Sequence, residues 1–436
     1  MPPPRPNLAI IGAGITGTTL SIALTARSIP HTVYEQSPSA TELGAGLGFG
    51  PNAARAMKII DPALWETFMR VSTRRDLPRL GGDPEKEAMW IEFLDGTLSS
   101  SSTDARAAFG VVAGFGEGHG AVHRAKWLEV LMGMVPEGVV RFGKRLEGIV
   151  DGERGGVVLT FEDGITAEAD AVVGCDGVKS KVREIMVGGR ESEGARCGYS
   201  GKYAYRCMIP MDKAVEEIGR ERAGVSSLWM GHGRHVLTFP VGKPGPDQLL
   251  NLVAFVTDSN ESWPSKDARS LALPATREDA LQDFEQGGFG KSWALFDLAD
   301  APLKSFYSGR ILVIGDAAHA STPHHGSGAG FCMEDVAVLS SLLEDPNKPD
   351  TARDLEAVFA AFDGNRRERD QWLVESSRRA ADLYEWRLPN TGKENFEGMK
   401  KDIEDRQAIC WGIDLDKAIR EAKADLRQRT SQATKM

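Results

Sequence analysis

A short apolar run, Leu8–Ile11, leads directly into the glycine pattern Gly12-Ala-Gly14-Ile-Thr-Gly17, and a helical stretch follows. A second strand-like segment then ends in a carboxylate, Glu35. Strand, glycine turn, helix and strand in this order form a β-α-β unit, which requires a parallel sheet with a helix packed on it. This feature constrains the fold of the chain more than any other.

Each glycine in the pattern has a distinct physical role. Gly12 permits the tight turn, Gly14 lets a pyrophosphate approach the helix N-terminus, and Gly17 lets helix and strand pack closely. Glu35 is placed to accept hydrogen bonds from a ribose, and a carboxylate there disfavours the 2′-phosphate of NADP. The motif therefore predicts an adenine dinucleotide, either FAD or NAD.

A second glycine-rich segment lies far downstream. The apolar run Arg310–Ile314 leads into Gly315-Asp316, and the loop from Pro323 to Gly330 opens onto a helix. Such a loop presents backbone amides and one carboxylate to a large polar cofactor. Together the two segments indicate one flavin bound from both ends of the chain.

Three more motifs lie between these two. A glycine-rich loop that contains Gly46 enters a helix, and Arg124 follows Gly120 at the start of an amphipathic helix. Asp176-Gly177 follows a strand-like run and precedes another helix start. An isolated Asp-Gly at a strand end is usually a turn. This motif therefore indicates a function only in combination with the other motifs.

In order and spacing, the glycine motif, Arg124, Asp176-Gly177 and Gly315-Asp316 resemble those of the single-component (group A) FAD-dependent aromatic monooxygenases, in particular the fungal salicylate hydroxylase-like family. The resemblance spans about residues 7–380. It implies that the first motif binds the ADP half of FAD, that Arg124 contacts the pyrophosphate region, and that Gly46 also contacts the cofactor. It also implies that Asp176 and Gly177 contribute to FAD and nicotinamide binding, and that Asp316 binds the ribityl hydroxyls.

The resemblance also implies the architecture, an α/β fold like that of p-hydroxybenzoate hydroxylase. A Rossmann-type FAD-binding domain carries an inserted mixed β-sheet substrate domain and C-terminal helices. The expected segments are 1–75, 111–190 and 301–345 for FAD binding, 76–110 and 191–300 for the substrate domain, and 346–436 for the helices. The long helical stretch contains Arg366, Arg367 and Arg369, which we expect on a solvated face.

By the same resemblance, the loop after Pro323 lies against the isoalloxazine ring, and its backbone amides approach the N1–C2 edge. Reduced flavin carries negative charge at N1, which amides at a helix N-terminus stabilise. The glycines let the backbone approach a flat ring without a Cβ in the way. The loop residues predicted to contact the cofactor are Pro323, Gly326, Gly328, Ala329 and Gly330.

The region between the Asp-Gly and Gly-Asp motifs contains several β-branched and aromatic runs separated by turns, which is typical of a sheet. In one of them, Arg206 shares the strand face of Ala204 and Met208. An arginine that enters an apolar cavity needs an anionic partner. A phenolate or carboxylate substrate would be that partner, and the alternative is a salt bridge at the strand edge. The resemblance favours substrate binding and a catalytic role.

Other side chains are candidates for the substrate pocket. Trp229, Phe239 and Phe255 either line an aromatic pocket or pack in the core. Some dearomatising relatives have a tyrosine at the position that Phe239 occupies in this chain. The absence of that tyrosine here favours ordinary ring hydroxylation. His324 or His325 either forms hydrogen bonds near flavin or substrate or has a structural role. His319 has no carboxylate or cysteine pattern typical of metal ligands near it in the sequence, and no metal site is expected.

The resemblance implies an NADH- or NADPH-dependent FAD monooxygenase that hydroxylates a phenol with O₂ through a flavin C4a-hydroperoxide. If the substrate is a salicylate, the reaction would also release CO₂. One alternative is a polyketide-pathway hydroxylase or dearomatase that acts on a resorcylic aldehyde-type phenol. A more distant alternative is an FAD-binding protein without turnover.

Composition excludes some partners. A net charge of −10 over 436 residues argues against nucleic acid, which needs a basic face. No apolar run is long enough to span a membrane, so we expect a cytoplasmic protein. The five cysteines show no CxxC spacing, which fits reduced thiols. The partners expected are a small phenol and O₂, and the chain is either a monomer or a homodimer.

Overall fold

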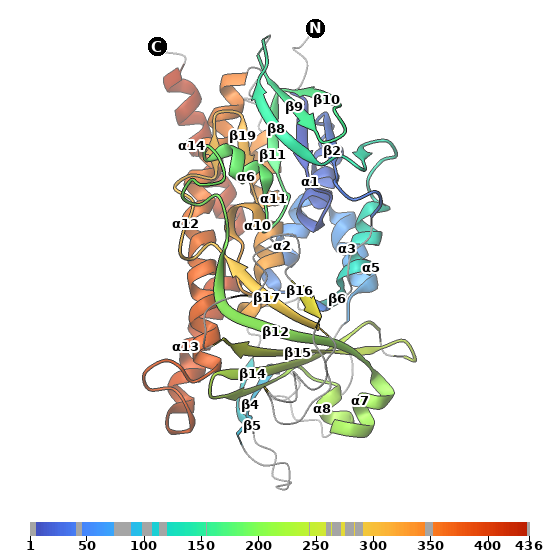
Figure 1. The fold of residues 1–436 in the computed structure, drawn as a ribbon, viewed down its shortest axis with the longest axis vertical. Coiled ribbons are helices and arrows are strands. Elements are labelled where there is room, and N and C mark those ends of the chain that lie inside the picture. Colours follow the sequence, from blue (N-terminus) through green and yellow to red (C-terminus); the bar gives the residue numbers. More distant parts are fainter. Residues whose placement is uncertain are drawn as a thin grey trace.

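Two β-sheets of different construction lie one above the other, and C-terminal helices run along one side of both (Figure 1). The computed structural model describes residues 6–40, 46–73, 89–97, 107–112, 120–153, 155–243, 245–258, 263, 272–274, 283, 291–344 and 352–433. Among the helices of these residues, none is long and apolar enough to cross a lipid bilayer.

The upper sheet is the α/β part that the first glycine motif predicts. Its strand order is β18-β19-β11-β1-β2-β7. These strands are β1 (Leu8–Ile11), β2 (His31–Tyr34), β7 (Val140–Arg141), β11 (Ala171–Gly174), β18 (Tyr307–Ser308) and β19 (Ile311–Val313). All neighbours are parallel except β18 and β19. Every residue of β1 and β11 is buried, as is typical of parallel strands covered on both faces.

Helices cover this sheet and carry its loops. They are α1 (Ile15–Ala26), α2 (Pro51–Ile60), α3 (Pro62–Val71), α5 (Arg124–Met132), α6 (Lys181–Met186), α10 (Asp316–His319) and α11 (Gly328–Leu343), with a 3-10 turn η1 (Pro323–His325) before α11. Both α2 and α3 begin with a proline, whose missing N–H costs nothing at the first helical position. Asp61 also caps α3 by accepting a hydrogen bond from the Ala63 amide at 2.8 Å.

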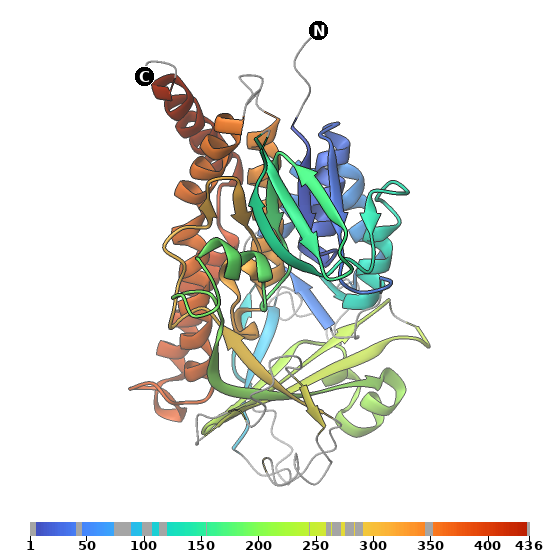
Figure 2. The same ribbon diagram turned by 45° about the horizontal axis from the view of Figure 1, so that its top comes forward.

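Two smaller sheets adjoin this layer. An antiparallel sheet is formed by β8 (Leu146–Asp151), β9 (Val157–Phe161) and β10 (Thr166–Ala169), and Figure 2 shows it beside the parallel sheet. A two-stranded ribbon pairs β3 (Gly46–Phe49) with β6 (Gly120–His123). This ribbon brings the Gly46 and Arg124 motifs next to each other although they are far apart in the sequence.

The lower sheet has eight strands in the order β16-β17-β12-β15-β14-β13-β4-β5. The strands are β4 (Met89–Asp95), β5 (Ala107–Val112), β12 (Gly198–Pro210), β13 (Ser227–Gly231), β14 (Arg234–Val241), β15 (Leu249–Thr257), β16 (Ala272–Pro274) and β17 (Lys291–Asp297). The sheet is mixed, because β4 and β13 are parallel whereas the other neighbours are antiparallel. Two short helices, α7 (Met211–Ile218) and α8 (Arg220–Ala223), follow β12.

The C-terminal part consists of α12 (Ala352–Tyr384), η2 (Lys393–Asn395), α13 (Phe396–Trp411) and α14 (Leu415–Ala433). Figures 1 and 2 agree that α12 extends along both sheet layers. The α/β class, the mixed sheet and the C-terminal helices are as predicted from the sequence. The division into domains at residues 75, 110, 190, 300 and 345 stays a prediction.

The charged face of α12 differs from the expectation. Arg366 is 1% exposed and not solvated. Its guanidinium donates to Glu334 at 2.7 Å, to Asp335 at 2.8 Å and to Asp370 at 2.5 Å. Burial alone would lower the pKa of Arg366, but the three carboxylates raise it by more than burial lowers it. The guanidinium therefore stays charged. Arg369 also donates to Glu334, at 2.8 Å. The bonds from Arg366 and Arg369 to Glu334 and Asp335 hold α12 against α11.

We predict that Arg366→Met destabilises the protein by about 3–5 kcal/mol, because it removes the cation that contacts all three buried carboxyl groups. Urea unfolding of the FAD-loaded protein measures the loss. Arg367→Met is the matched control, since Arg367 pairs with Asp363 at 3.1 Å with 37% of its side chain exposed. It should cost less than about 1 kcal/mol. Equal midpoints for the two variants would contradict the role assigned to Arg366.

Candidate functional site

A cavity of about 1920 Å³ lies between the two sheet layers. It is larger than the roughly 300–1,000 Å³ of an ordinary ligand pocket. Its lining includes the glycine turn after β1, the β3–β6 ribbon, the loop between α10 and α11, and one face of the eight-stranded sheet. A cavity of this size and extent can hold a dinucleotide together with a second, smaller molecule.

The first glycine motif forms one end of the cavity. Gly12 has a φ of +98°, and a Cβ there would lie 2.6 Å from the carbonyl oxygen of Cys175, so no other residue fits. Next to Gly14, by contrast, no atom lies within 4 Å of an added Cβ, which leaves room for a ligand. Glu35 accepts hydrogen bonds from the amides of Ala13 at 2.7 Å and Ser37 at 2.8 Å. These bonds hold its carboxylate at the edge of the cavity.

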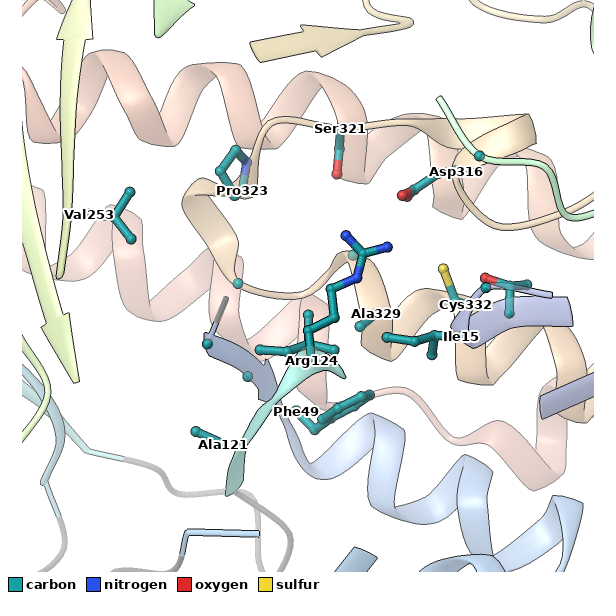
Figure 3. A pocket seen from close by; sticks show the side chains of 18 of the residues that line it. Ile15, Phe49, Ala121, Arg124, Val253, Asp316, Ser321, Pro323, Ala329 and Cys332 are labelled. Atoms are coloured by element: carbon teal, nitrogen blue, oxygen red, sulfur yellow. The ribbon is translucent and has the colours of Figure 1, made fainter. Parts of the chain in front are cut away.

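The second glycine segment forms the opposite wall. Gly315 turns the chain with a φ of +62°, and its amide donates to Asp335 at 2.9 Å. Asp316 follows with an exposed side chain that lines the cavity. Figure 3 shows Asp316, Ser321, Pro323 and Ala329 around one space. The loop therefore offers a carboxylate, backbone and the start of α11 to a single ligand.

Asp176 also lines the cavity, but its carboxylate is engaged within its own turn. It accepts from the Ser180 hydroxyl at 2.5 Å and from the amides of Lys181 at 2.7 Å and Val182 at 3.1 Å. Burial raises the pKa of Asp176, and these hydrogen bonds partly offset that effect. The side chain thus fixes the start of α6 and the Gly177 turn beside the cavity.

Two arginines enter the same cavity from different layers. Arg124 begins α5, and Figure 3 shows its guanidinium near Ser321, Asp316 and Ala329. Arg206 reaches the cavity from β12 of the lower sheet. Burial lowers the pKa of Arg206 to about 10, and the positive charge of Arg124 lowers it too. Both observations mean that an anion in the cavity would be favourable.

Strand alternation decides which side chains of the lower sheet face the cavity. The lining includes Arg206, Leu237, Phe239, Val253 and Phe255, all on one face. Phe239 also packs against the ribbon, because a Cβ on Gly46 would lie 2.6 Å from its ring.

Three predicted site residues lie outside the lining. Trp229 is on the opposite face of β13 from Leu228, which lines the cavity. Gly17 instead permits close packing, since a Cβ there would lie 2.0 Å from the Gly12 carbonyl oxygen. Gly330 likewise permits close packing, because a Cβ there would lie 2.9 Å from Nδ2 of Asn52. The other residues predicted for the cofactor or the substrate all border the cavity.

His319, for which the sequence showed no carboxylate or cysteine pattern, is in contact with a carboxylate from another helix. It is 1% exposed, and its Nε2 lies 2.7 Å from Asp335 and 3.9 Å from Asp370. Burial lowers the pKa of His319, but the two carboxylates raise it to about 9. The sequence did not reveal this pairing, because the partners lie on α11 and α12. His319 therefore braces the loop beneath the cavity.

A second buried cluster was also missed. Glu385, directly after α12, accepts from Lys202 of β12 at 2.5 Å and contacts Nδ1 of His235 of β14 at 3.1 Å. His324, which lines the cavity, belongs to the same group. His235, His324 and Glu385 have spacing that could hold a metal ion, as do His319, Asp335 and Asp370. In both groups a cation, Lys202 or Arg366, already contacts a carboxylate, so we interpret both as ion-pair clusters.

The residues present fit FAD. The glycine turn leaves open space at Gly14, and backbone at Gly48, Gly326 and Gly328 meets no atom closer than 3.7 Å to an added Cβ. The cavity is long enough to join the Glu35 end to the Pro323 loop. Fold and cavity together define a flavoprotein.

Comparison with known proteins supports the conclusion that the chain is a flavoprotein. The model of the FAD binding domain matches residues 128–356. The FAD-dependent monooxygenase pigN of Monascus ruber is 39% identical over 98% of both chains, and the salicylate hydroxylase asL1 of Sarocladium schorii is 36% identical over 98% of this chain and 92% of its own. The solved structure of a salicylate hydroxylase substrate complex matches with a TM-score of 0.78 at 29% identity, covering 96% of this chain and 98% of the other.

The chain therefore belongs to the FAD-dependent monooxygenases of the salicylate hydroxylase type, with the FAD-binding fold of that family. This confirms the predicted family, the predicted fold and FAD as the cofactor.

The His319 pairing predicts a pH dependence of stability. The folded pKa of about 9 exceeds the unfolded value of 6.5, so this contribution is complete below about pH 6.5 and is lost as the pH rises through about 9. The loss is at most about 3 kcal/mol. Urea midpoints between pH 6 and pH 10 should fall in the wild type but stay flatter in His319→Gln. His325→Gln should keep the wild-type slope, since burial lowers the pKa of His325 to about 4. A wild-type slope in His319→Gln would contradict the assignment.

Proposed function

We propose that the protein is an NADH- or NADPH-dependent aromatic hydroxylase that inserts one oxygen atom of O₂ into a phenol. The observation that carries this proposal is Arg206, a cation on the sheet face that lines the same cavity as the predicted flavin loop. Because burial and Arg124 both lower the pKa of Arg206, an anionic ligand beside it is stabilised. A phenolate or a salicylate carboxylate has that charge.

Different residues of the chain would bind different parts of FAD. Glu35 and the Gly12–Gly14 turn would hold the ADP half of FAD, Arg124 its pyrophosphate region and Asp316 its ribityl chain. When bound and reduced by a nicotinamide, FAD supplies the activated oxygen for the reaction. The amides of the Gly326–Gly330 segment would stabilise negative charge on the ring.

Arg206 would hold the phenol in its ionised form, which is the more electron-rich nucleophile. Phe239, Val253 and Phe255 surround it with apolar surface that excludes water and positions the ring. His324, whose ring lies 4.8 Å from that of Phe255, also lines this space and is a candidate hydrogen-bonding partner. In this scheme no side chain needs to attack the substrate covalently.

A second candidate has a specific observation in its favour. The lining of the cavity also includes Arg220, Glu221 and Val225, at α8 and the turn after it. This part of the cavity offers room for a phenol larger than salicylate, such as a substituted resorcylic aldehyde of the polyketide type. Hydroxylation or dearomatisation of such a phenol, without loss of CO₂, is the alternative to decarboxylative hydroxylation.

One experiment separates these functions. The purified FAD-loaded protein is incubated with NADH or NADPH and with salicylate, 2,4-dihydroxybenzoate or 2,4-dihydroxybenzaldehyde, and products are identified by mass. We expect gain of one oxygen, with loss of CO₂ if the substrate is a salicylate. Oxidation of the nicotinamide with peroxide release and no aromatic product, for these and for bulkier acylphenols, would contradict the proposal and favour an FAD protein without substrate turnover.

Arg206→Ala tests the substrate role. Losing the cation should lower kcat/KM by about 100-fold, because a close charge pair is worth about 2–5 kcal/mol when one partner is truncated. The variant should still purify with FAD. Arg234→Ala is the control, since Arg234 lies exposed at the start of β14 in the same sheet. Unchanged kcat/KM in Arg206→Ala would rule out a substrate contact.

A further inference from the structure

We propose that His324 and the buried cluster Lys202–His235–Glu385 form a proton path that leads from the substrate phenol to Asp382. The inference rests on the proposed function, since it concerns the phenol that Arg206 would hold. His324 would be the catalytic base, whereas His235, Glu385 and Lys202 act through it as positioning and relay residues.

The geometry places the cluster on the cavity side of the sheet. Lys202 shares a strand face with Ala204 and Arg206 on β12, and His235 shares one with Leu237 on β14. The imidazole of His235 stacks on Phe255, with ring centroids 4.4 Å apart and an interplanar angle of 12°. Since Phe255 lines the cavity, the cluster begins directly beneath the substrate space.

His324 connects the cluster to the cavity. Its ring lies 5.2 Å from that of His235 and 4.8 Å from that of Phe255. It is 8% exposed, and within the described residues neither of its ring nitrogens has a hydrogen-bond partner. A buried imidazole with both nitrogens unsatisfied is costly unless a ligand completes it. A phenol in the cavity supplies one partner, and His235 is placed to be the other.

The hydrogen bonds determine which nitrogen of His235 is available. Burial alone would raise the pKa of Glu385, but His235 and Lys202 lower it by more than burial raises it. Glu385 is therefore an ionised carboxylate. It must therefore accept, and Nδ1 of His235 must donate at 3.1 Å. In neutral His235 this leaves Nε2 as an acceptor, and burial keeps the ring neutral by lowering its pKa. Burial and His235 likewise lower the pKa of His324, so both rings start without extra protons.

The proton transfer balances without any further reactant. The phenol O–H bond breaks as an N–H bond forms on His324, and the other ring nitrogen of His324 passes a proton to Nε2 of His235. Nitrogen and carboxylate oxygen atoms of His324, His235 and Glu385 lie within 4.8 Å of one another, a span that a ring rotation or one water molecule closes. His235 then gives its Nδ1 proton to Glu385.

The exit runs through a lysine to the surface. Lys202 Nζ lies 2.5 Å from Glu385 and 3.0 Å from Asp382, and 34% of the Asp382 side chain is exposed. Lys202 passes a proton to Asp382 as it takes one from Glu385, and Asp382 releases it to solvent. The phenolate stays behind beside Arg206, which compensates its charge. Both rings return to their neutral forms after each transfer.

A structural role is the competing explanation, because Glu385 also ties the end of α12 to β12 and β14. His235→Gln separates the two. Glutamine can still donate to Glu385 but cannot accept a proton and pass one on. His232→Gln is the matched control, since His232 is an exposed histidine in the turn just before β14.

The test follows proton release when oxidised, FAD-loaded protein binds 2,4-dihydroxybenzaldehyde, by stopped flow with a pH indicator in weak buffer. Wild type and His232→Gln should release protons rapidly. His235→Gln should release the same amount at equilibrium but about 100-fold more slowly, as expected when general-base transfer is lost. A merely structural role would lower the unfolding midpoint or the phenol affinity and leave the release rate unchanged.

Asp382→Asn keeps the test decisive if His235→Gln fails to fold, because Asp382 is half-buried at the surface. It should also slow release, by at least several-fold. Wild-type release rates in a folded His235→Gln, or in Asp382→Asn, would overturn the path while leaving the proposed function intact. Failure of the wild type to bind or ionise any phenol of the panel would overturn both.

Discussion

The ion cluster around Arg366 is the contact on which the candidate site depends. One guanidinium donates to Glu334 and Asp335 of α11 and to Asp370 of α12 inside the protein, and Arg369 and His319 add positive charge beside Glu334 and Asp335. Asp335 also accepts from the amide of Gly315, so the position of the Gly315–Asp316 turn is determined by the same cluster. A buried charge of this kind is stable only while every partner is in place. The position of the Gly315–Asp316 turn therefore depends on the packing of α11 on α12.

Two ion clusters, one at the middle of α12 and one just past its end, position different parts of the site. Near its middle, Arg366 braces the wall that faces the cofactor. Just past its end, Glu385 gathers Lys202 and His235 from the sheet that faces the substrate. One helix thus positions both walls of the cavity, which explains why a C-terminal segment without a recognisable motif is needed for a site whose motifs lie elsewhere. A shift of α12 would move both walls together.

Local patterns predicted the parts of the site that local structure determines. Gly12, Gly315 and Asp316 could be recognised because a turn between a strand and a helix imposes residue types at fixed spacing. The face of Arg206 followed from strand alternation. The same alternation, seen in the structure, turns Trp229 away from the cavity. The buried clusters could not be predicted, because Lys202 and Glu385 are 183 positions apart. An i,i+4 pair such as Arg366–Asp370 has the same pattern whether its helix face is buried or solvated.

Charge links the cofactor and the substrate in this cavity. The chain is acidic, with a net charge of −10, yet Arg124 and Arg206 enter the cavity together and Arg124 lowers the pKa of Arg206. This repulsion costs free energy until anions enter. A pyrophosphate beside Arg124 would reduce the repulsion between the two guanidinium groups, and this would make it easier to hold the charged Arg206 beside an anionic phenol. Because coupling between two sites is reciprocal, the same electrostatics by which bound FAD prepares Arg206 for a phenolate would make the bound phenolate help to retain FAD.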